Sequence, residues 1–361
     1  MNYANRQKKL AAGLDHAGVE ALLITHLPNI MYLCGFTGSS GALLVHASGL
    51  SRPAFVTDGR YTQQANEEVQ GARVVISGKP AWMAACERGQ KAGIARLGFE
   101  AQHIAYGSQQ ALAKLVRGQM RLKPVSGLTE RLRETKDPDE IDQIRAAAAL
   151  ADELFQTALS AIRPGVPETQ VAGAMEMHAR RKGAEKMSFD TIVAAGPRSA
   201  LPHGRASSQP IPASGFIIMD YGVILAAYCS DMTRTVHMGR VSRKRRRMYE
   251  AVREAQRASI EAVRPGVEAG TVDRAGRQIL KKAGYGVYFT HSTGHGVGIE
   301  VHESPRLAKG QPQQLVPGMV VTIEPGIYIP EEGGVRIEDM VLITETGHEV
   351  LTTVTKDLIE L

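Results

Sequence analysis

Two apolar runs of the chain end on acidic residues, and a second acid follows each of them. Asp220 ends the run in FIIMDYG, and Asp231 follows it in YCSDMTRTV. Glu324 ends the run MVVTIE in the same way, and Glu338 follows it in GGVRIED. A continuous apolar run predicts a strand covered on both faces, where a carboxylate is costly unless it is paired or bound to a cation. The four acids therefore indicate a site that binds positive charge.

Clustered carboxylates repel one another in a low dielectric and stay ionised only beside strong positive charge. One arginine cannot neutralise four of them, whereas a pair of divalent cations can. His295 in HSTGHGVGIEVHE is the candidate imidazole ligand, because the glycines around it let the backbone approach closely. Oxygen-rich ligation with one imidazole suits Mn, Fe, Co or Zn. Two metals bridged by carboxylates can hold a hydroxide between them as a nucleophile at neutral pH.

The elements that must position these residues occur twice in the sequence. AIRPGV at 161–166 recurs as AVRPGV at 262–267, an offset of 101 residues, and each copy lies between two amphipathic helices. Further on, PASGFIIMDYG is matched by VPGMVVTIEPG, so Asp220 aligns with Glu324 at an offset of 104. Landmarks in the same order at nearly one offset predict two halves related by a pseudo-twofold axis. Two facing hairpins would then bring the four acids together.

The part of the chain before this duplication alternates helical and strand signals. Residues 5–17 predict an amphipathic helix, 20–36 a strand followed by a turn, and 41–48 and 53–61 two further strands. Asp137, before a proline and two acids, predicts the capped start of a long helix. We therefore expect an α/β (α+β) protein with a smaller mixed N-terminal domain, residues 1–130, and a C-terminal domain, residues 131–361.

The formal net charge of +6 and the basic cluster SRKRRRM at 242–248 raise the question of a nucleic-acid partner. No recognition motif or stacking aromatics accompany the cluster, so we expect Ser242 to cap a helix whose basic residues face solvent. No run approaches membrane-spanning length, so we expect neither nucleic acid nor membrane as a partner. Three cysteines, Cys34, Cys86 and Cys229, show no metal-ligand spacing, which favours a reducing compartment, the cytoplasm.

These residues in their contexts resemble the metal-ligand set of the creatinase/aminopeptidase P family, the "pita-bread" metallopeptidases that include aminopeptidase P and prolidase. GFTGSSG and TDGRY are also typical of the N-terminal domain of its proline-specific members. The resemblance implies a C-terminal domain built on a curved antiparallel sheet with helices on its outer face. It also implies a homodimer and two divalent metal ions per subunit, manganese first, with cobalt or zinc as alternatives. The implied metal ligands are Asp220, Asp231, His295, Glu324 and Glu338.

Further residues match positions that contact substrate in the family. His203 in LPHGR resembles a histidine that hydrogen-bonds the substrate near its reacting carbonyl, and His291 and His302 flank His295 at minus four and plus seven. Arg336 resembles an arginine that buttresses the site. Arg306 in HESPR matches an arginine of short microbial prolidases that binds the substrate carboxylate, for which a bidentate guanidinium is the natural choice.

The activity implied is hydrolysis of the Xaa-Pro bond at the N-terminus of dipeptides or short peptides. That bond is a tertiary amide without an N–H, and its nitrogen must be protonated before it leaves. Glu324, as ligand and base, would pass a proton to this nitrogen, while His302 or His203 would stabilise the oxyanion. We favour an Xaa-Pro dipeptidase and keep an Xaa-Pro aminopeptidase acting on longer peptides as the alternative. The complete ligand set argues against a creatinase-like non-peptide hydrolase and against a non-catalytic binding module.

Overall fold

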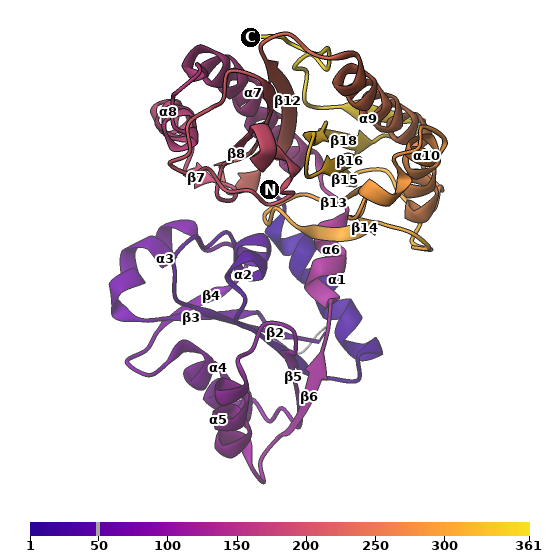
Figure 1. The fold of residues 1–361 in the computed structure, drawn as a ribbon. Helices are drawn as coiled ribbons and strands as arrows, with labels where there is room; N and C mark the ends of the chain where they lie inside the picture. The colour runs from indigo at the N-terminus through magenta and orange to yellow at the C-terminus, as the bar shows by residue number, and fades with distance from the viewer. Residues whose placement is uncertain (48–50) are drawn as a thin grey trace. The chain divides into compact units, whose positions relative to one another are not determined.

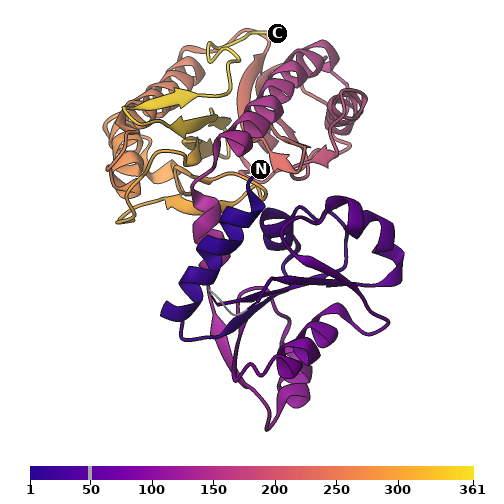
Figure 2. The same cartoon turned by 180° about the vertical axis from the view of Figure 1, so that it is seen from behind.

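The computed structural model describes residues 1–47 and 51–361, and the chain divides into two compact units, residues 1–133 and 134–361 (Figure 1). The first unit contains a six-stranded mixed sheet in the order β4-β3-β2-β1-β5-β6. Helices α4 and α5 pack on one face of that sheet (Figures 1 and 2). Its elements are α1 (Tyr3–His16), β1 (Ala21–Ile24), α2 (Leu27–Cys34), β2 (Ala42–His46), β3 (Ala54–Thr57), η1 (Gly59–Tyr61), α3 (Thr62–Glu68), β4 (Arg73–Ile76), α4 (Ala81–Lys91), β5 (Arg96–Glu100), α5 (Tyr106–Val116), β6 (Arg121–Val125) and α6 (Leu128–Glu134).

Two of the elements expected in this unit differ from the structure: one expected turn is a helix, and one expected strand is shorter than predicted. The turn expected after the first strand is the helix α2, which has Pro28 in its first turn, where proline lacks no needed hydrogen bond. Ile30 and Leu33 of this helix are fully buried. The strand expected at 53–61 ends at Thr57 and continues as a single turn of 3₁₀-helix. Ser48, at the end of the strand expected at 41–48, lies outside the described residues.

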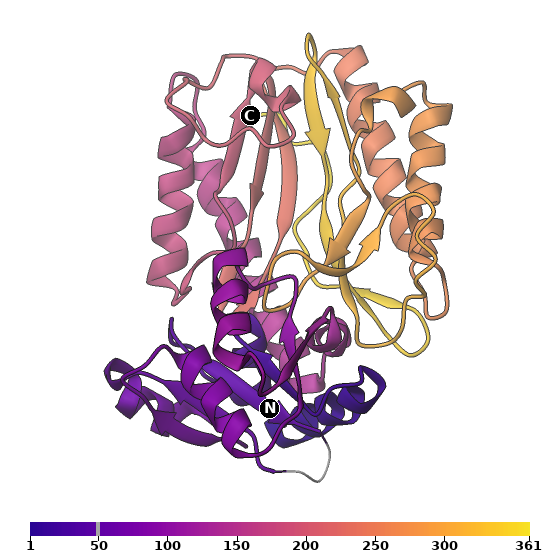
Figure 3. The same cartoon turned by 90° about the horizontal axis from the view of Figure 1, so that it is seen from below.

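The second unit consists of two similar halves (Figure 3). In each half a pair of packed helices lies outside antiparallel strands. The first half contains α7 (Pro138–Ala161), α8 (Glu168–Arg181), β7 (Lys186–Met187), β8 (Ile192–Ala195), η2 (Gly196–Ala200), β9 (Gly215–Tyr221), β10 (Val223–Leu225), β11 (Tyr228–Cys229) and β12 (Met232–Met238). The second contains α9 (Arg243–Ala262), α10 (Ala269–Lys282), η3 (Gly286–Tyr288), β13 (Gly294–Gly296), β14 (Glu303–Leu307), β15 (Val320–Ile323), β16 (Gly326–Ile329), β17 (Gly333–Arg336), β18 (Asp339–Ile343) and β19 (His348–Val350).

The duplication inferred from the sequence is visible in the hydrogen bonds. Helices α7 and α9 end at Ala161 and Ala262, 101 residues apart, and α8 and α10 begin at the same offset. The turn between the helices of each pair contains a glycine with positive φ, Gly165 or Gly266. The amide of Gly165 donates to the carbonyl of Ile211, and that of Gly266 donates to the carbonyl of Leu315, 104 residues later. The predicted fold, a pita-bread domain with an internal pseudo-twofold, is confirmed.

Local sequence signals explain how the helices of these halves begin. Asp137 and Glu140 form a capping box at the start of α7, because each side chain accepts a hydrogen bond from the other's backbone amide. The Ser242 hydroxyl caps α9 by accepting from the Arg245 amide. Most of the basic residues after it are exposed, as expected, and three of them (Lys244, Arg245 and Arg246) pair with Glu332 or Glu360.

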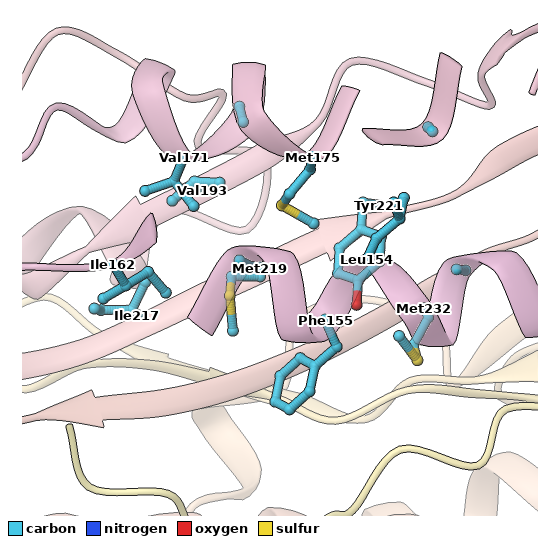
Figure 4. Packing of buried hydrophobic residues seen from close by; sticks show 14 of the residues in the cluster. Leu154, Phe155, Ile162, Val171, Met175, Val193, Ile217, Met219, Tyr221 and Met232 are labelled. Atoms are coloured by element: carbon cyan, nitrogen blue, oxygen red, sulfur yellow. The ribbon is translucent and has the colours of Figure 1, made fainter. Parts of the chain in front are cut away.

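The core of the first half shows how the helices hold a ligand strand in place. Leu154 and Phe155 of α7 pack with Met175 of α8 against Ile217 and Met219, all of them buried (Figure 4). The last two lie on β9, the strand that carries Asp220. Burial of such side chains, worth about 1.5–3 kcal/mol each, fixes the strand on its helix-facing side. Within residues 1–47 and 51–361, no helix is both long and apolar enough to cross a membrane.

Candidate metal centre

The five predicted ligands lie at the ends of strands from both halves. Asp220 is the second-last residue of β9, and Asp231 immediately precedes its antiparallel partner β12. Glu324 directly follows β15, and Glu338 directly precedes the partner β18. His295 lies in the middle of β13, which pairs with β15. The two hairpins therefore present their acids from corresponding positions.

Three of these residues form a compact group of potential metal ligands. One ligand atom each from Asp231, His295 and Glu338 lie within 4.8 Å of one another. Nε2 of His295 is 3.6 Å from Oδ2 of Asp231 and 3.6 Å from Oε1 of Glu324. These distances are too long for hydrogen bonds, so the imidazole faces the carboxylates across a gap.

The hydrogen bond on the far side of His295 fixes which nitrogen can bind a cation. Nδ1 is 3.0 Å from the carbonyl oxygen of Gly296, which can only accept, so Nδ1 carries the proton. Nε2 of the neutral ring therefore turns its lone pair toward the acids. Burial lowers the pKa of His295 to about 4, which keeps the ring neutral near pH 7. A lone pair facing carboxylate oxygens is repulsive unless a cation lies between them.

The carboxylates carry more negative charge than the protein around them compensates. Burial, followed by repulsion from Glu338 and other acids, raises the pKa of Asp231 well above its ordinary value. Burial, together with Glu324 and Asp220, does the same for Glu338. Burial raises the pKa of Glu324 to about 8, although Arg336 opposes the shift. Buried acids that cannot all ionise without added positive charge are what a divalent-metal site requires.

Arg336 is a cation that the protein itself supplies to the cluster, and all three of its guanidinium nitrogens already donate hydrogen bonds within the protein. The buried guanidinium donates from Nη2 to Oδ2 of Asp220 at 2.5 Å and from Nη1 to the Tyr328 hydroxyl at 2.7 Å. Nε donates to the Thr233 hydroxyl at 3.1 Å. That hydroxyl in turn donates to Oε2 of Glu338 at 2.6 Å. Arg336 therefore orients two of the acids from one side.

One buried oxygen of the cluster remains without a partner. Oδ1 of Asp220 is buried and accepts no hydrogen bond from any residue the structure describes. A buried carboxylate oxygen without a hydrogen bond is costly, and ligation of a cation would satisfy it. The donor set of four carboxylates and one imidazole fits Mn²⁺, Co²⁺ or Zn²⁺.

Close backbone packing around His295 depends on two glycines. A Cβ on Gly294 would lie 1.9 Å from the carbonyl oxygen of Thr322, and one on Gly296 would lie 2.2 Å from that of Ser304. A side chain at either position would push β13 away from its neighbours and move His295. The glycine-rich spacing noted in the sequence therefore has a steric cause.

The remaining predicted residues lie at different depths. His302 is exposed, and its ring centroid is 4.4 Å from that of His295. His203 is exposed as well, and its charge contributes to lowering the pKa of His302, an effect in which burial is the largest cause. Arg306 lies directly across from His295 in the β13–β14 pair and is exposed. His291 differs, because both of its ring nitrogens already have protein partners, the carbonyl of Ser292 and the Tyr328 hydroxyl.

Two residues of the site were not identified from the sequence. Tyr328 bridges Arg336 and His291 through its hydroxyl, and Thr233 bridges Arg336 and Glu338. A tyrosine in GIYI and a threonine in DMTRT are ordinary strand residues, so neither pattern signals a role. The alternation of side chains along β12 could have placed Thr233 on the same face as Asp231.

The fold and this carboxylate–histidine cluster define a metallopeptidase of the pita-bread type. The model of metallopeptidase family M24 matches residues 142–345, more than half of the chain, and the creatinase/prolidase N-terminal domain model matches residues 6–135. The chain belongs to metallopeptidase family M24, whose members depend on two metal ions.

Several proteins that are similar to this chain over most of its length are named as Xaa-Pro peptidases. An Xaa-Pro dipeptidase of Pyrococcus horikoshii is 38% identical over 352 residues, which cover 98% of this chain and 98% of that protein. The structure of an Xaa-Pro dipeptidase from Bacillus anthracis is similar with a TM-score of 0.96 at 40% identity, covering 100% of both chains. The structure of an X-Pro aminopeptidase from Thermotoga maritima has a TM-score of 0.88 at 31% identity, covering 95% of this chain and 98% of that one.

Proposed function

We propose that this protein is an Xaa-Pro dipeptidase that hydrolyses the Xaa-Pro bond of dipeptides and short peptides with the help of two divalent metal ions. The observation that carries the proposal is the group formed by Asp231, His295 and Glu338, whose ligand atoms lie within 4.8 Å of one another. Asp220 and Glu324 would complete the ligand set. Similarity over the whole chain to proteins named Xaa-Pro dipeptidase supports the substrate class.

Glu324 is the residue best suited to move a proton. When bound, two divalent ions would polarise the scissile carbonyl and activate a water molecule at neutral pH. The carboxylate of Glu324 lies within the cluster, its Oε1 3.6 Å from Nε2 of His295, and is therefore within reach of a water molecule held at the centre. In the proposed reaction it takes a proton from the attacking water and delivers it to the prolyl nitrogen, which has no proton of its own.

The exposed residues around the cluster would bind the substrate. His302 and His203 would donate hydrogen bonds to the oxygen that becomes negative as the carbonyl is attacked. Arg306 is the cross-strand partner of His295, so its side chain leaves the sheet on the same face as the imidazole. A guanidinium at that place would pair with the carboxylate of a dipeptide held at the metals. His291 and Arg336 would act by holding Tyr328 and Asp220 in position.

Three further features of the proposal rest mainly on the resemblance. Manganese is the proposed native metal, with cobalt or zinc as substitutes, because each accepts carboxylate and imidazole ligands. The proposed assembly is a homodimer, which light scattering would test against a monomer. The proposed location is the cytoplasm, which agrees with three free and buried cysteines.

The alternative substrate range is tested directly by comparing peptide lengths. Manganese-loaded enzyme should be assayed side by side on an Xaa-Pro dipeptide and an Xaa-Pro-Yaa-Zaa tetrapeptide. We expect the larger kcat/KM for the dipeptide. Preferred cleavage of the tetrapeptide would instead identify an Xaa-Pro aminopeptidase, as in the similar Thermotoga maritima structure.

A further inference from the structure

A second buried charge cluster lies behind the metal centre and contains no predicted ligand. Arg234 follows Asp231 by three residues on β12, and Asp339 follows Glu338 directly at the start of β18. Both are almost completely inaccessible, with 1% and 0% of their surface exposed. Nη2 of the arginine donates to Oδ1 of Asp339 at 2.7 Å. A buried ion pair of this kind is costly to desolvate and seldom contributes net stability, so its presence beside the ligands calls for another reason.

The guanidinium of Arg234 holds main-chain atoms of the ligand strands as well as the carboxylate. Nη1 donates to the carbonyl oxygen of Thr233 at 2.9 Å and to that of Glu338 at 2.5 Å. The first of these residues is also the one whose hydroxyl holds the Glu338 carboxylate. Arg234 therefore fixes a predicted ligand both through its backbone and through the residue that orients its side chain.

The remaining donors of Arg234 attach the last segment of the chain. Nε lies 3.3 Å from the carbonyl oxygen of Val354 and 3.2 Å from that of Thr355, and Nη2 is 2.8 Å from the former. The planar fork of an arginine can hold several oxygens in fixed directions, which a lysine cannot. Replacement by lysine should therefore keep the charge but lose the geometry.

The Asp339 carboxylate is itself fully occupied by donors. Oδ1 accepts from Thr352 at 2.8 Å, and Oδ2 accepts from Gln256 at 2.7 Å and from Lys356 at 2.6 Å. With its oxygens engaged in this way, Asp339 is a fixed anion that anchors Arg234, and it does not compete for a metal ion.

The pair of Arg234 and Asp339 lies where the two halves of the second unit meet. β12 belongs to the first half and β18 to the second, and the two strands lie in different sheets. The amide of Glu338 donates to the carbonyl of Thr233 at 3.1 Å across the boundary between these two sheets, which we call the seam. Arg234 strengthens the seam at the point where Asp231 and Glu338 must face each other.

We propose that Arg234 and Asp339 are positioning residues that set the separation of Asp231 and Glu338 and thereby the affinity of the centre for its metal ions. The inference rests on the proposed metal-dependent function. It assigns to the two residues a role in metal binding beyond the stability of the fold.

Metal binding by Arg234→Lys tests the proposal, with Arg253→Ala as the matched control. Arg253 also ties α9 to the C-terminal segment, through an exposed pair with Asp357, but among the described residues it forms no hydrogen bond or ion pair with β12 or β18. Mn²⁺ would be titrated calorimetrically into metal-free protein, and the visible spectrum of the Co²⁺ form would be recorded. We expect Arg234→Lys to bind Mn²⁺ about 10–100-fold more weakly and to alter the Co²⁺ spectrum, since outer partners of ligands have effects of this size. The control should match the wild type.

A folded Arg234→Lys protein with wild-type affinity and spectrum would overturn the proposal. If this variant does not fold, Lys356→Met, which removes one donor from Asp339, takes its place. A smaller loss of affinity is then expected, and unchanged binding would overturn the proposal equally. A wild-type protein that binds no Mn²⁺ would refute the proposed function and the inference with it, whereas unchanged binding in the variants refutes the inference alone.

Discussion

Replacement of Glu324 by glutamine should change activity and stability in opposite directions. Burial raises the pKa of this carboxyl from an ordinary 4.5 to about 8. Between these pH values the folded, metal-free protein holds a proton that the unfolded chain releases. The free energy of unfolding therefore falls as the pH rises from about 4.5 to about 8, and above that range the contribution of this group is lost completely. At about 1.4 kcal/mol per pKa unit, the loss is on the order of 5 kcal/mol.

Glutamine has nearly the same shape but cannot ionise, so the variant should escape this loss. Metal-free Glu324→Gln should unfold at a higher urea concentration than the metal-free wild type at pH 8, with little difference at pH 5. With metal added, its turnover of an Xaa-Pro dipeptide should fall ~10²–10⁴-fold, the usual worth of general acid–base catalysis. Exposed Glu345→Gln is the matched control, for which we expect no change in either measurement.

Urea unfolding of chelator-treated proteins at several pH values, together with the peptide assay, measures both effects. Equal pH dependence of stability in the variant and the wild type would refute the assigned electrostatics of the site. Near-native turnover in Glu324→Gln would refute its assigned role in proton transfer.

Two further substitutions test the substrate contact and the packing of the site. Arg306→Ala should reduce kcat/KM for an Xaa-Pro dipeptide ~10–100-fold, the effect of losing a charged hydrogen bond, and affect a tetrapeptide less. Lys309→Ala, at an exposed neighbouring position, is the control. An unimpaired dipeptide rate in Arg306→Ala would contradict the role assigned to this arginine. Gly294→Ala places a Cβ 1.9 Å from the Thr322 carbonyl oxygen and should cost about 1–3 kcal/mol or more in thermal or urea unfolding. Gly347→Ala, whose Cβ meets nothing within 4 Å, should have little effect, and equal stability of the two variants would show that the close approach is unimportant.

The sequence predicted those features that local patterns encode. Buried strands that end on acids, the capped helix at Asp137 and the two helix pairs at one offset all follow from residue type and spacing. The turn expected after the first strand, within residues 20–36, is instead the helix α2, because a proline is equally compatible with the first turn of a helix.

The contacts between the halves could not be predicted from local patterns. Arg234 and Asp339 are 105 residues apart, and Thr233 and Glu338 are equally distant in the chain. In the sequence an arginine within a strand has no visible partner, and only the fold brings the aspartate to it. The tyrosine that joins Arg336 to His291 is likewise indistinguishable from a core residue until the sheet is formed.

Metal content measured together with activity tests the central claim most directly. Protein treated with a chelator should lose Xaa-Pro hydrolysis, and titration with Mn²⁺ or Co²⁺ should restore it in proportion to metal bound, up to two ions per chain. Metal-free protein, verified by elemental analysis, that still cleaves Xaa-Pro dipeptides at the untreated rate would contradict the account.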